Sequence, residues 1–166
     1  MAAPERLEAG DKAPAFKIAI DDGSGAPASL SLARLKGTPF VVYFYPKDDT
    51  SGCTKEAVAF SAAAAKFKAR GVTILGISKD SLAAHAKFRA KHKLTIPLGS
   101  DEALEMAKAW GVWIEKSLYG RKYMGMERAT FLVNGRGRII AAWHNVKVPS
   151  HVEAVLAAVK DNGAML

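Results

Sequence analysis

An unbroken apolar run at residues 39–46, PFVVYFYP, constrains the fold of this chain more than any other feature. The run lacks the alternation of a strand with one face in water, so we interpret it as a strand buried on both faces. A second run, VTILGIS at 72–78, predicts another buried strand. Between the two, a stretch rich in Ala, Lys and Phe predicts a helix from about Cys53 to Ala69, and Gly71 is placed to end it.

The remaining segments alternate between helical and extended patterns. We predict further helices at 81–94 with Asp80 or Ser81 as the cap, at 101–110, and from Pro149 to about Lys160, where Ser150 and Glu153 have capping-box spacing. We predict a strand at 96–100, a hairpin of 129–133 with 138–144 around the turn Asn134–Gly137, and a small hairpin around Asp21–Gly25. This order predicts an α/β fold, a thioredoxin-like sandwich whose central mixed β-sheet is flanked by helices, with an added N-terminal β-hairpin.

Length and composition agree with one ordinary domain spanning residues 1–166. Its 49% hydrophobic and 24% charged residues are typical of a soluble globular protein. No apolar run reaches the roughly 20 residues that cross a bilayer, and the N-terminus lacks the basic start and apolar stretch of a secretory signal. The single cysteine excludes an internal disulfide. We therefore expect a cytoplasmic location and no membrane partner.

The formal net charge of +8 raises the hypothesis of a nucleic-acid-binding protein. The positive residues are spread along the chain, with local densities at 87–93 and from Lys116 to Lys122. Neither is a long basic run, and both lie among apolar residues at helix-like or loop-like spacing. We interpret them as solvated faces and expect no nucleic-acid partner, although the charge can steer anionic partners or help to keep a thiolate charged.

Cys53 is the best candidate for a reactive residue. It follows a polar, turn-forming segment at 47–52 and opens a predicted helix directly after a buried strand. At a helix N-terminus the unpaired backbone N–H groups and the helix dipole favour an anion, so the reactive thiolate is favoured over the thiol. Gly52 removes a side chain where a small substrate would approach backbone donors. The alternative interpretation is a small buried hydrophobic residue, a common role for a lone cysteine.

The residues around Cys53 resemble those of a known enzyme family. Pro46, Thr50 and Cys53 have the Pro-x-x-x-Thr-x-x-Cys spacing of peroxiredoxins, and FYPKDDTSGCTKE is similar to the bacterioferritin comigratory protein branch, also called the Q type. The similarity continues through 76–81, 119–133 and 146–156, so it covers nearly the whole chain. Arg128 lies at the place of the arginine that completes the site in this family.

The resemblance implies a catalytic role for four residues. Cys53 would attack the distal oxygen of a peroxide and become a sulfenic acid. Arg128 would stabilise the thiolate and the charge that develops on the O–O bond. The hydroxyl of Thr50 can both accept and donate a hydrogen bond, so it would orient the substrate. Pro46, which has no N–H, would shield the thiolate from water.

Two further residues are assigned to substrate binding. The backbone N–H groups near Gly52 and Cys53 would complete the site. Glu56, one helical turn on, would hold Arg128 in place; an equally good interpretation is an acidic residue at the helix dipole. The resemblance implies no metal, haem or nucleotide cofactor.

One departure from the family decides how the sulfenic acid is recycled. Many members of this branch have a resolving cysteine five residues after the first, and others have it in the next helix. Here those positions hold Val58 and, in our alignment, Arg89. The chain is therefore expected to be a one-cysteine variant that depends on an external thiol: thioredoxin, glutaredoxin or glutathione. We expect a monomer that can form a Cys53-linked dimer on oxidation.

Other polar residues are predicted to have no catalytic function. His85 and His92 are two turns apart on one predicted helix, not the single turn that metal ligands usually need. His144 and His151 are expected on the surface. Asp48 and Asp49, adjacent acids in a turn, are expected to bond to nearby backbone.

The sequence thus favours a peroxidase for hydrogen peroxide and small organic hydroperoxides. Two alternatives stay open at this point. A redox sensor or thiol-transfer protein would use the same sulfenic acid as a signal to a partner. A basic binding module is suggested by net charge alone, and salt-sensitive retention on nucleic acid would be needed to support it.

Overall fold

The computed structural model describes residues 6–166, and its centre is the strand β3 (Phe40–Phe44), which is buried along its whole length. β3 pairs in parallel with β4 (Thr73–Ser78) and antiparallel with β8 (Ala129–Val133). These strands belong to a seven-stranded sheet of order β2-β1-β5-β4-β3-β8-β9. Its other members are β1 (Lys17–Asp21), β2 (Ala28–Ser31), β5 (Leu98–Ser100) and β9 (Ile139–Trp143). The predicted mixed sheet and N-terminal hairpin are confirmed.

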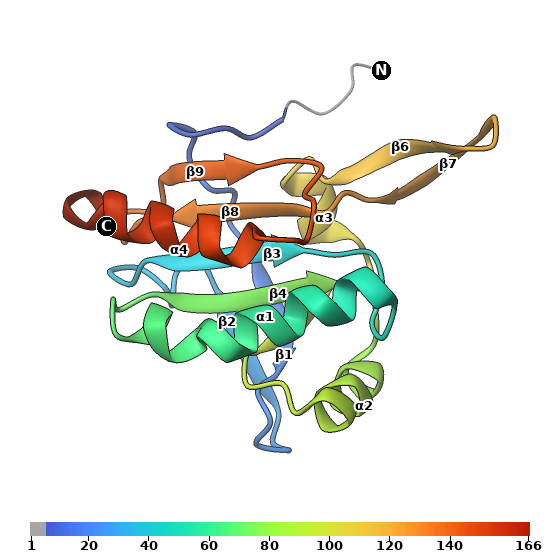
Figure 1. Ribbon diagram of the computed structural model, residues 1–166, viewed down its shortest axis with the longest axis horizontal. Helices are drawn as coiled ribbons and strands as arrows, with labels where there is room; N and C mark the ends of the chain where they lie inside the picture. The colour runs from blue at the N-terminus through green and yellow to red at the C-terminus, as the bar shows by residue number, and fades with distance from the viewer. Residues whose placement is uncertain (1–5) are drawn as a thin grey trace.

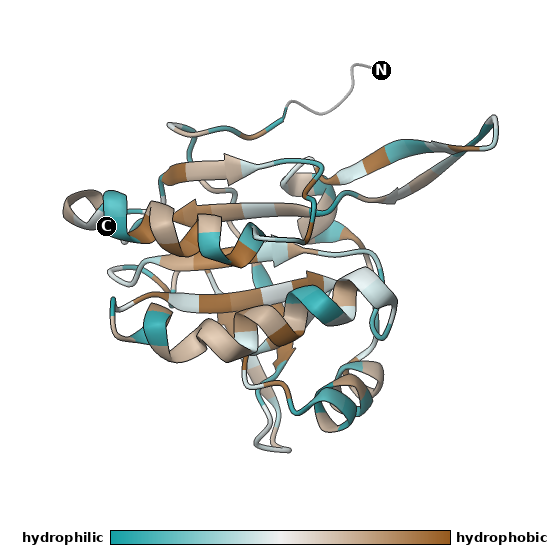
Figure 2. Ribbon diagram, viewed as in Figure 1, coloured by the Kyte–Doolittle hydropathy of each residue, from teal (hydrophilic) through white to brown (hydrophobic). Residues whose placement is uncertain are grey.

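Helices cover both faces of the sheet (Figure 1). One face carries α1 (Ser51–Lys68), α2 (Leu82–His92) and α4 (His151–Asp161), and the other carries the short α3 (Glu105–Ala109). Successive residues of β3 point to opposite faces, so Tyr43 packs with the three longer helices and Phe44 packs with the cluster that contains α3. Figure 2 shows the apolar colour on the central strands and on parts of α1 and α4. The predicted helix-flanked sandwich is therefore confirmed.

The helices differ from the sequence-based prediction at the start of α1, in the length of α3 and in the cap of α4. α1 begins at Ser51 with Thr50 as its N-cap residue, two residues before the predicted start. α3 has only five residues, because the carboxylate of Asp101 accepts the N–H groups of Met106 and Ala107 at 3.2 and 2.8 Å and holds the preceding residues in a turn. The prediction of a capping box at α4 is wrong, since Ser150 has φ 62° and its side chain makes no cap hydrogen bond.

The largest omission of the sequence-based prediction is a second hairpin, β6 (Trp113–Leu118) and β7 (Arg121–Met126). These strands form a two-stranded sheet of their own, which projects from the body of the molecule (Figure 1). Most of the hairpin is exposed, so burial imposes no clean period-two pattern on its sequence. The basic density from Lys116 to Lys122 lies in this hairpin.

Within residues 6–166, no helix combines the length and apolarity needed to cross a membrane. The same residues contain no group of three or more His, Cys, Asp or Glu side chains placed to hold a metal ion.

The packing around Tyr43 generates a prediction about stability. Gly76 lies opposite Tyr43 in the β3–β4 register, and a Cβ atom there would come within 2.8 Å of the phenol ring. The ring has little room to move, since it stacks on Tyr45 and Phe60 at centroid distances of 5.5 and 4.5 Å. We expect Gly76→Ala to lower the free energy of unfolding by about 1–3 kcal/mol, measured by urea denaturation.

Gly163→Ala is the control, because no atom lies within 4 Å of the added methyl group. This variant should stay within about 0.5 kcal/mol of the parent. Equal urea midpoints for the two variants would show that the close approach of Gly76 to Tyr43 does not limit packing.

Candidate active site

Cys53 lies in the first turn of α1, where the chain turns from β3 into the helix. The first helical bond runs from the N–H of Thr54 to the carbonyl of Thr50, so the N–H groups before Thr54 have no partner within the helix. The thiol itself is buried, with 1% of the residue exposed. The sequence placed Cys53 at the helix N-terminus, and the structure places it as the third residue of the helix.

The Arg128 guanidinium lies between Cys53 and Glu56. Its Nη1 donates to Glu56 Oε1 at 2.8 Å, and its Nη2 lies 3.4 Å from Cys53 Sγ. Gly52 makes this approach feasible, since a Cβ atom on residue 52 would come within 3.1 Å of Nη2. The structure therefore brings together four residues that the sequence singled out: Cys53, Arg128, Glu56 and Gly52.

Burial changes the pKa values of the ionisable side chains around Cys53. Glu56 is fully buried, and the loss of hydration raises the pKa of its carboxyl from 4.5 to about 7, although the Arg128 charge opposes the shift. Burial works against the charge of Arg128, but Glu56 and Cys53 outweigh it, so the pKa of Arg128 is raised. The hydroxyl of Tyr43 and Oε2 of Glu56 are buried without a hydrogen-bond partner in the described chain.

Thr50 and Pro46 lie on the exposed side of the site. The Thr50 hydroxyl donates to the carbonyl of Lys47 at 2.9 Å, which leaves its oxygen lone pairs able to accept a bond. Pro46 and Arg128 line a groove of about 1080 Å³ that continues along the β6–β7 hairpin past Trp113 and Lys116.

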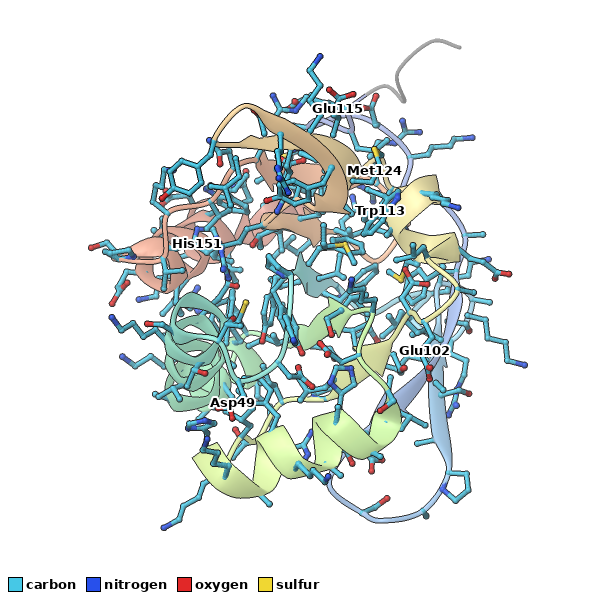
Figure 3. The ribbon with its side chains drawn as sticks, turned by 90° about the vertical axis from the view of Figure 1, so that its right-hand side faces the viewer. Asp49, Glu102, Trp113, Glu115, Met124 and His151 are labelled. Atoms are coloured by element: carbon cyan, nitrogen blue, oxygen red, sulfur yellow. The ribbon has the colours of Figure 1, made fainter. Side chains whose placement is uncertain are left out.

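The loop before Cys53 is anchored by residues whose role the sequence did not predict. Asp48 accepts a hydrogen bond from the Tyr45 hydroxyl at 2.6 Å and lies 2.7 Å from Nδ1 of His85. Asp49, between α1 and α2 in Figure 3, bonds to Lys91 and His92 at 2.7 and 2.8 Å. The expectation that both acids bond to nearby backbone is therefore wrong; they tie the loop to the side chains of Tyr45, just after β3, and of α2.

The expectation of surface positions for two histidines is also wrong. His151 is buried, its Nε2 lies 2.8 Å from the Thr130 hydroxyl, and burial together with the Arg128 charge lowers its pKa to about 4. His144 has only 9% of its side chain exposed, and Nε2 lies 2.8 Å from the carbonyl of Leu7.

The two positions of resolving cysteines are occupied in different ways. Val58 is 43% exposed on α1. Arg89 on α2 donates to the carboxylate of Asp21 at 2.6 Å and to the carbonyl of Leu94 at 2.7 Å. It therefore fastens α2 to the sheet.

Comparison with known proteins agrees with this geometry. Residues 9–142 match the AhpC/TSA family. The chain belongs to this family. This peroxiredoxin is 45% identical over 150 residues to the putative peroxiredoxin bcp of Coxiella burnetii, an alignment that covers 90% of this chain and 97% of the relative. It is 36% identical over 156 residues to peroxiredoxin Bcp of Escherichia coli, covering 94% and 97% of the two chains.

Solved structures place it in the same branch. A structure of Xanthomonas campestris peroxiredoxin Q has a TM-score of 0.83 at 39% identity and covers 89% of this chain and 91% of its own. A cysteine-to-serine mutant of PrxQ from Xylella fastidiosa has a TM-score of 0.87 at 35% identity, with coverage of 96% and 99%. The predicted resemblance to Q-type peroxiredoxins is confirmed: this peroxiredoxin is a thiol-dependent peroxidase with a thioredoxin-like fold and one cysteine.

The raised pKa of Glu56 predicts a pH-dependent stability. The unfolded chain gives up this proton near pH 4.5, whereas the folded protein keeps it until about pH 7. Between these values the unfolded state binds fewer protons, so the free energy of unfolding should fall by about 3 kcal/mol as the pH rises from about 4.5 to about 7. Glu56→Gln cannot ionise and should lack this contribution.

Urea denaturation at several pH values between 5 and 8 measures the effect as the difference between parent and variant. Glu153→Gln, a change at an exposed position on α4, should follow the parent. Parallel curves for the parent and Glu56→Gln would mean that the Glu56 carboxyl ionises in the folded protein as it does in water.

Proposed function

We propose that Cys53 is the peroxide-reducing nucleophile, and that Arg128, Thr50, Pro46, Gly52 and Glu56 form the rest of the site. The contact that carries this proposal is the 3.4 Å approach of Arg128 Nη2 to Cys53 Sγ, with Nη1 bonded to Glu56. A fixed guanidinium next to the sulfur stabilises a thiolate and the negative charge of the transition state. The two terminal nitrogens of the planar guanidinium contact Glu56 and Cys53 at the same time.

The reaction begins when the Cys53 thiolate attacks the distal oxygen of a hydroperoxide. A sulfur lone pair forms the S–O bond, and the O–O bond breaks toward the proximal oxygen, which takes up a proton and leaves as water or an alcohol. Cys53 is then a sulfenic acid. Hydrogen peroxide and small organic hydroperoxides are the proposed substrates; a solved structure of the Xanthomonas campestris Bcp, 38% identical, is named for alkyl peroxide reduction.

The other residues assist this step. The free lone pairs of Thr50 Oγ1 can accept a hydrogen bond from the peroxide, since its own hydrogen is directed at Lys47. Pro46 shields the sulfur side of the groove without adding an N–H donor. Glu56 fixes Arg128, and Gly52 makes room for it.

Recycling needs a thiol from outside, because the chain has no second cysteine. That thiol condenses with the sulfenic acid to a mixed disulfide and water, and a second thiol then displaces Cys53. Thioredoxin, glutaredoxin and glutathione are the proposed donors, in a monomeric protein in the cytoplasm. A redox sensor is the second candidate, favoured by the missing resolving cysteine; stoichiometric oxidation without turnover, and a stable partner disulfide, would distinguish it.

Cys53→Ser tests the nucleophile. The substitution replaces sulfur by oxygen at a buried position, so the circular dichroism spectrum should not change. Peroxide consumption with any thiol reductant should fall to the uncatalysed rate. Turnover retained by the folded variant would exclude a thiol mechanism.

Arg128→Ala and Arg128→Lys test the stabilisation of the thiolate. Loss of the guanidinium should slow peroxide attack roughly 10²-fold or more, the usual effect of removing a transition-state donor. Lysine should restore only part of the rate, because one ammonium cannot bond Glu56 and face the sulfur together. Stopped-flow oxidation of Cys53 measures both. Equal rates in all three proteins would show that Arg128 is misassigned.

Val58 generates a prediction about oxidation products. Residues five apart on a helix have Cα atoms about 8–9 Å from each other, beyond the roughly 7 Å that a disulfide tolerates. Without reductant, one equivalent of peroxide should therefore give one added oxygen or a Cys53-linked dimer by intact-mass measurement, and higher doses should add more oxygen. Val58→Cys should instead lose two hydrogens, provided that the first turns of α1 unwind. A parent protein that recovers its free thiol unaided would contradict this scheme.

A further inference from the structure

The β6–β7 hairpin exposes an unusual share of the apolar surface. Of the seven large hydrophobic side chains that are exposed in residues 6–166, four lie in it, at exposures of 47–97%. They are Leu118, Tyr119, Tyr123 and Met124. The two strands pair only with each other and extend away from the main sheet (Figure 1). Apolar side chains gathered on a projecting element are typical of a protein-interaction surface.

The tip of the hairpin holds an aromatic residue in an unfavourable backbone conformation. Tyr119 has φ 50° and Gly120 has φ 77°, the signs of a two-residue type I′ turn. The first position of such a turn is normally Asn, Asp or Gly, because a bulky side chain at positive φ is disfavoured. Tyr119 is 97% exposed, so no packing within the described chain compensates for this cost. A contact with another molecule would account for tyrosine at this position.

The hairpin is also basic. It carries Lys116, Arg121 and Lys122, and its one acidic residue, Glu115, lies 3.6 Å from Lys122. From residue 116 to residue 126 there is no acidic side chain at all. The charge of the hairpin therefore complements an acidic surface.

The hairpin stands directly beside the candidate active site. The groove of about 1080 Å³ runs from Pro46 and Arg128 to Trp113, Lys116 and Tyr123 of the hairpin. Figure 3 views the molecule from this side and shows Trp113, Glu115 and Met124 together on it. Because the chain has one cysteine, each catalytic cycle requires an external thiol to reach the sulfur next to this groove.

We propose that the β6–β7 hairpin is a docking arm for a protein thiol reductant with an acidic surface around its reactive cysteine, and that Tyr119 is the anchoring side chain. The proposal rests on the proposed function, since it concerns the recycling of Cys53. The docked thiol condenses with the Cys53 sulfenic acid, forming an S–S bond and releasing water. A second thiol of the same partner attacks the partner sulfur, so that Cys53 leaves as a thiolate and the partner leaves oxidised.

Tyr119→Asn tests the anchor without damaging the turn. Asn-Gly is a preferred type I′ pair, so the variant should fold at least as well as the parent. Turnover of hydrogen peroxide is measured with a thioredoxin of net negative charge, its reductase and NADPH, and separately with dithiothreitol. We expect the KM for thioredoxin to rise roughly tenfold, as for an interface hot spot. The rates with dithiothreitol and of Cys53 oxidation should not change.

Arg121→Gln tests the charge, and Arg136→Gln is its matched control. Arg136 is an exposed arginine in the turn between β8 and β9, at the end of the sheet opposite Cys53. Removing Arg121 should raise the KM for thioredoxin and weaken its dependence on salt, whereas removing Arg136 should do neither. Equal effects of the two variants would assign the attraction to net charge and overturn the docking arm.

Three other results would also overturn the proposal. These are an unchanged KM for thioredoxin in Tyr119→Asn, an equal loss of activity with dithiothreitol, and a parent dimer that dissociates in this variant by sedimentation, which would assign the hairpin to a second copy of the chain. Parent turnover with dithiothreitol but none with thioredoxin would reject the docking partner and leave the peroxidase standing. Failure of the parent with both reductants would instead reject the proposed function, and the docking arm with it.

Discussion

The candidate site depends on two contacts of the Arg128 guanidinium, which bonds Glu56 and faces the sulfur of Cys53. The guanidinium joins two segments that are 72 residues apart in sequence, the first turns of α1 and the residue just before β8. Sheet register brings them together, since Ala129 pairs with Phe44 at the end of β3 from which the chain passes into α1. The pairing of the central strands therefore places Arg128 beside α1.

Hydrogen bonds from α2 anchor the surroundings of this arrangement. The loop from β3 to α1 is tied to α2 by Asp48 with His85 and by Asp49 with Lys91. α2 in turn is held to β1 by Arg89, the position where the family alignment allows a resolving cysteine. A helix that must open to deliver a second thiol needs weak attachments, whereas a one-cysteine enzyme has no such requirement. The bonds of Arg89 agree with an α2 that has no second cysteine to deliver.

Sequence patterns predicted the parts of the fold that burial controls. β3 and β4 are apolar on both faces, which left a continuous signal, whereas the largely exposed β6–β7 hairpin follows no period and was missed. Helix-terminus physics singled out Cys53 and Gly52, but it had no means of finding Arg128, which the family resemblance alone supplied. Neither helix-terminus physics nor the family resemblance predicted the pairing of Asp48 with His85. A hydrogen bond between residues 37 apart produces no recognisable pattern in a single sequence. Contacts between distant segments are where a single sequence carries least information.

Burial of the sulfur separates the two halves of the catalytic cycle. With 1% of Cys53 exposed, the sulfur lies beside the Arg128 guanidinium and almost wholly out of contact with bulk water. A protein thiol must bring a bulky surface against the rim before its sulfur can reach Cys53. The rim includes Pro46 and, across the groove, the β6–β7 hairpin. Chemistry at the sulfur therefore depends on the packed interior, whereas recognition of a large reductant falls to exposed elements that contribute little to the core.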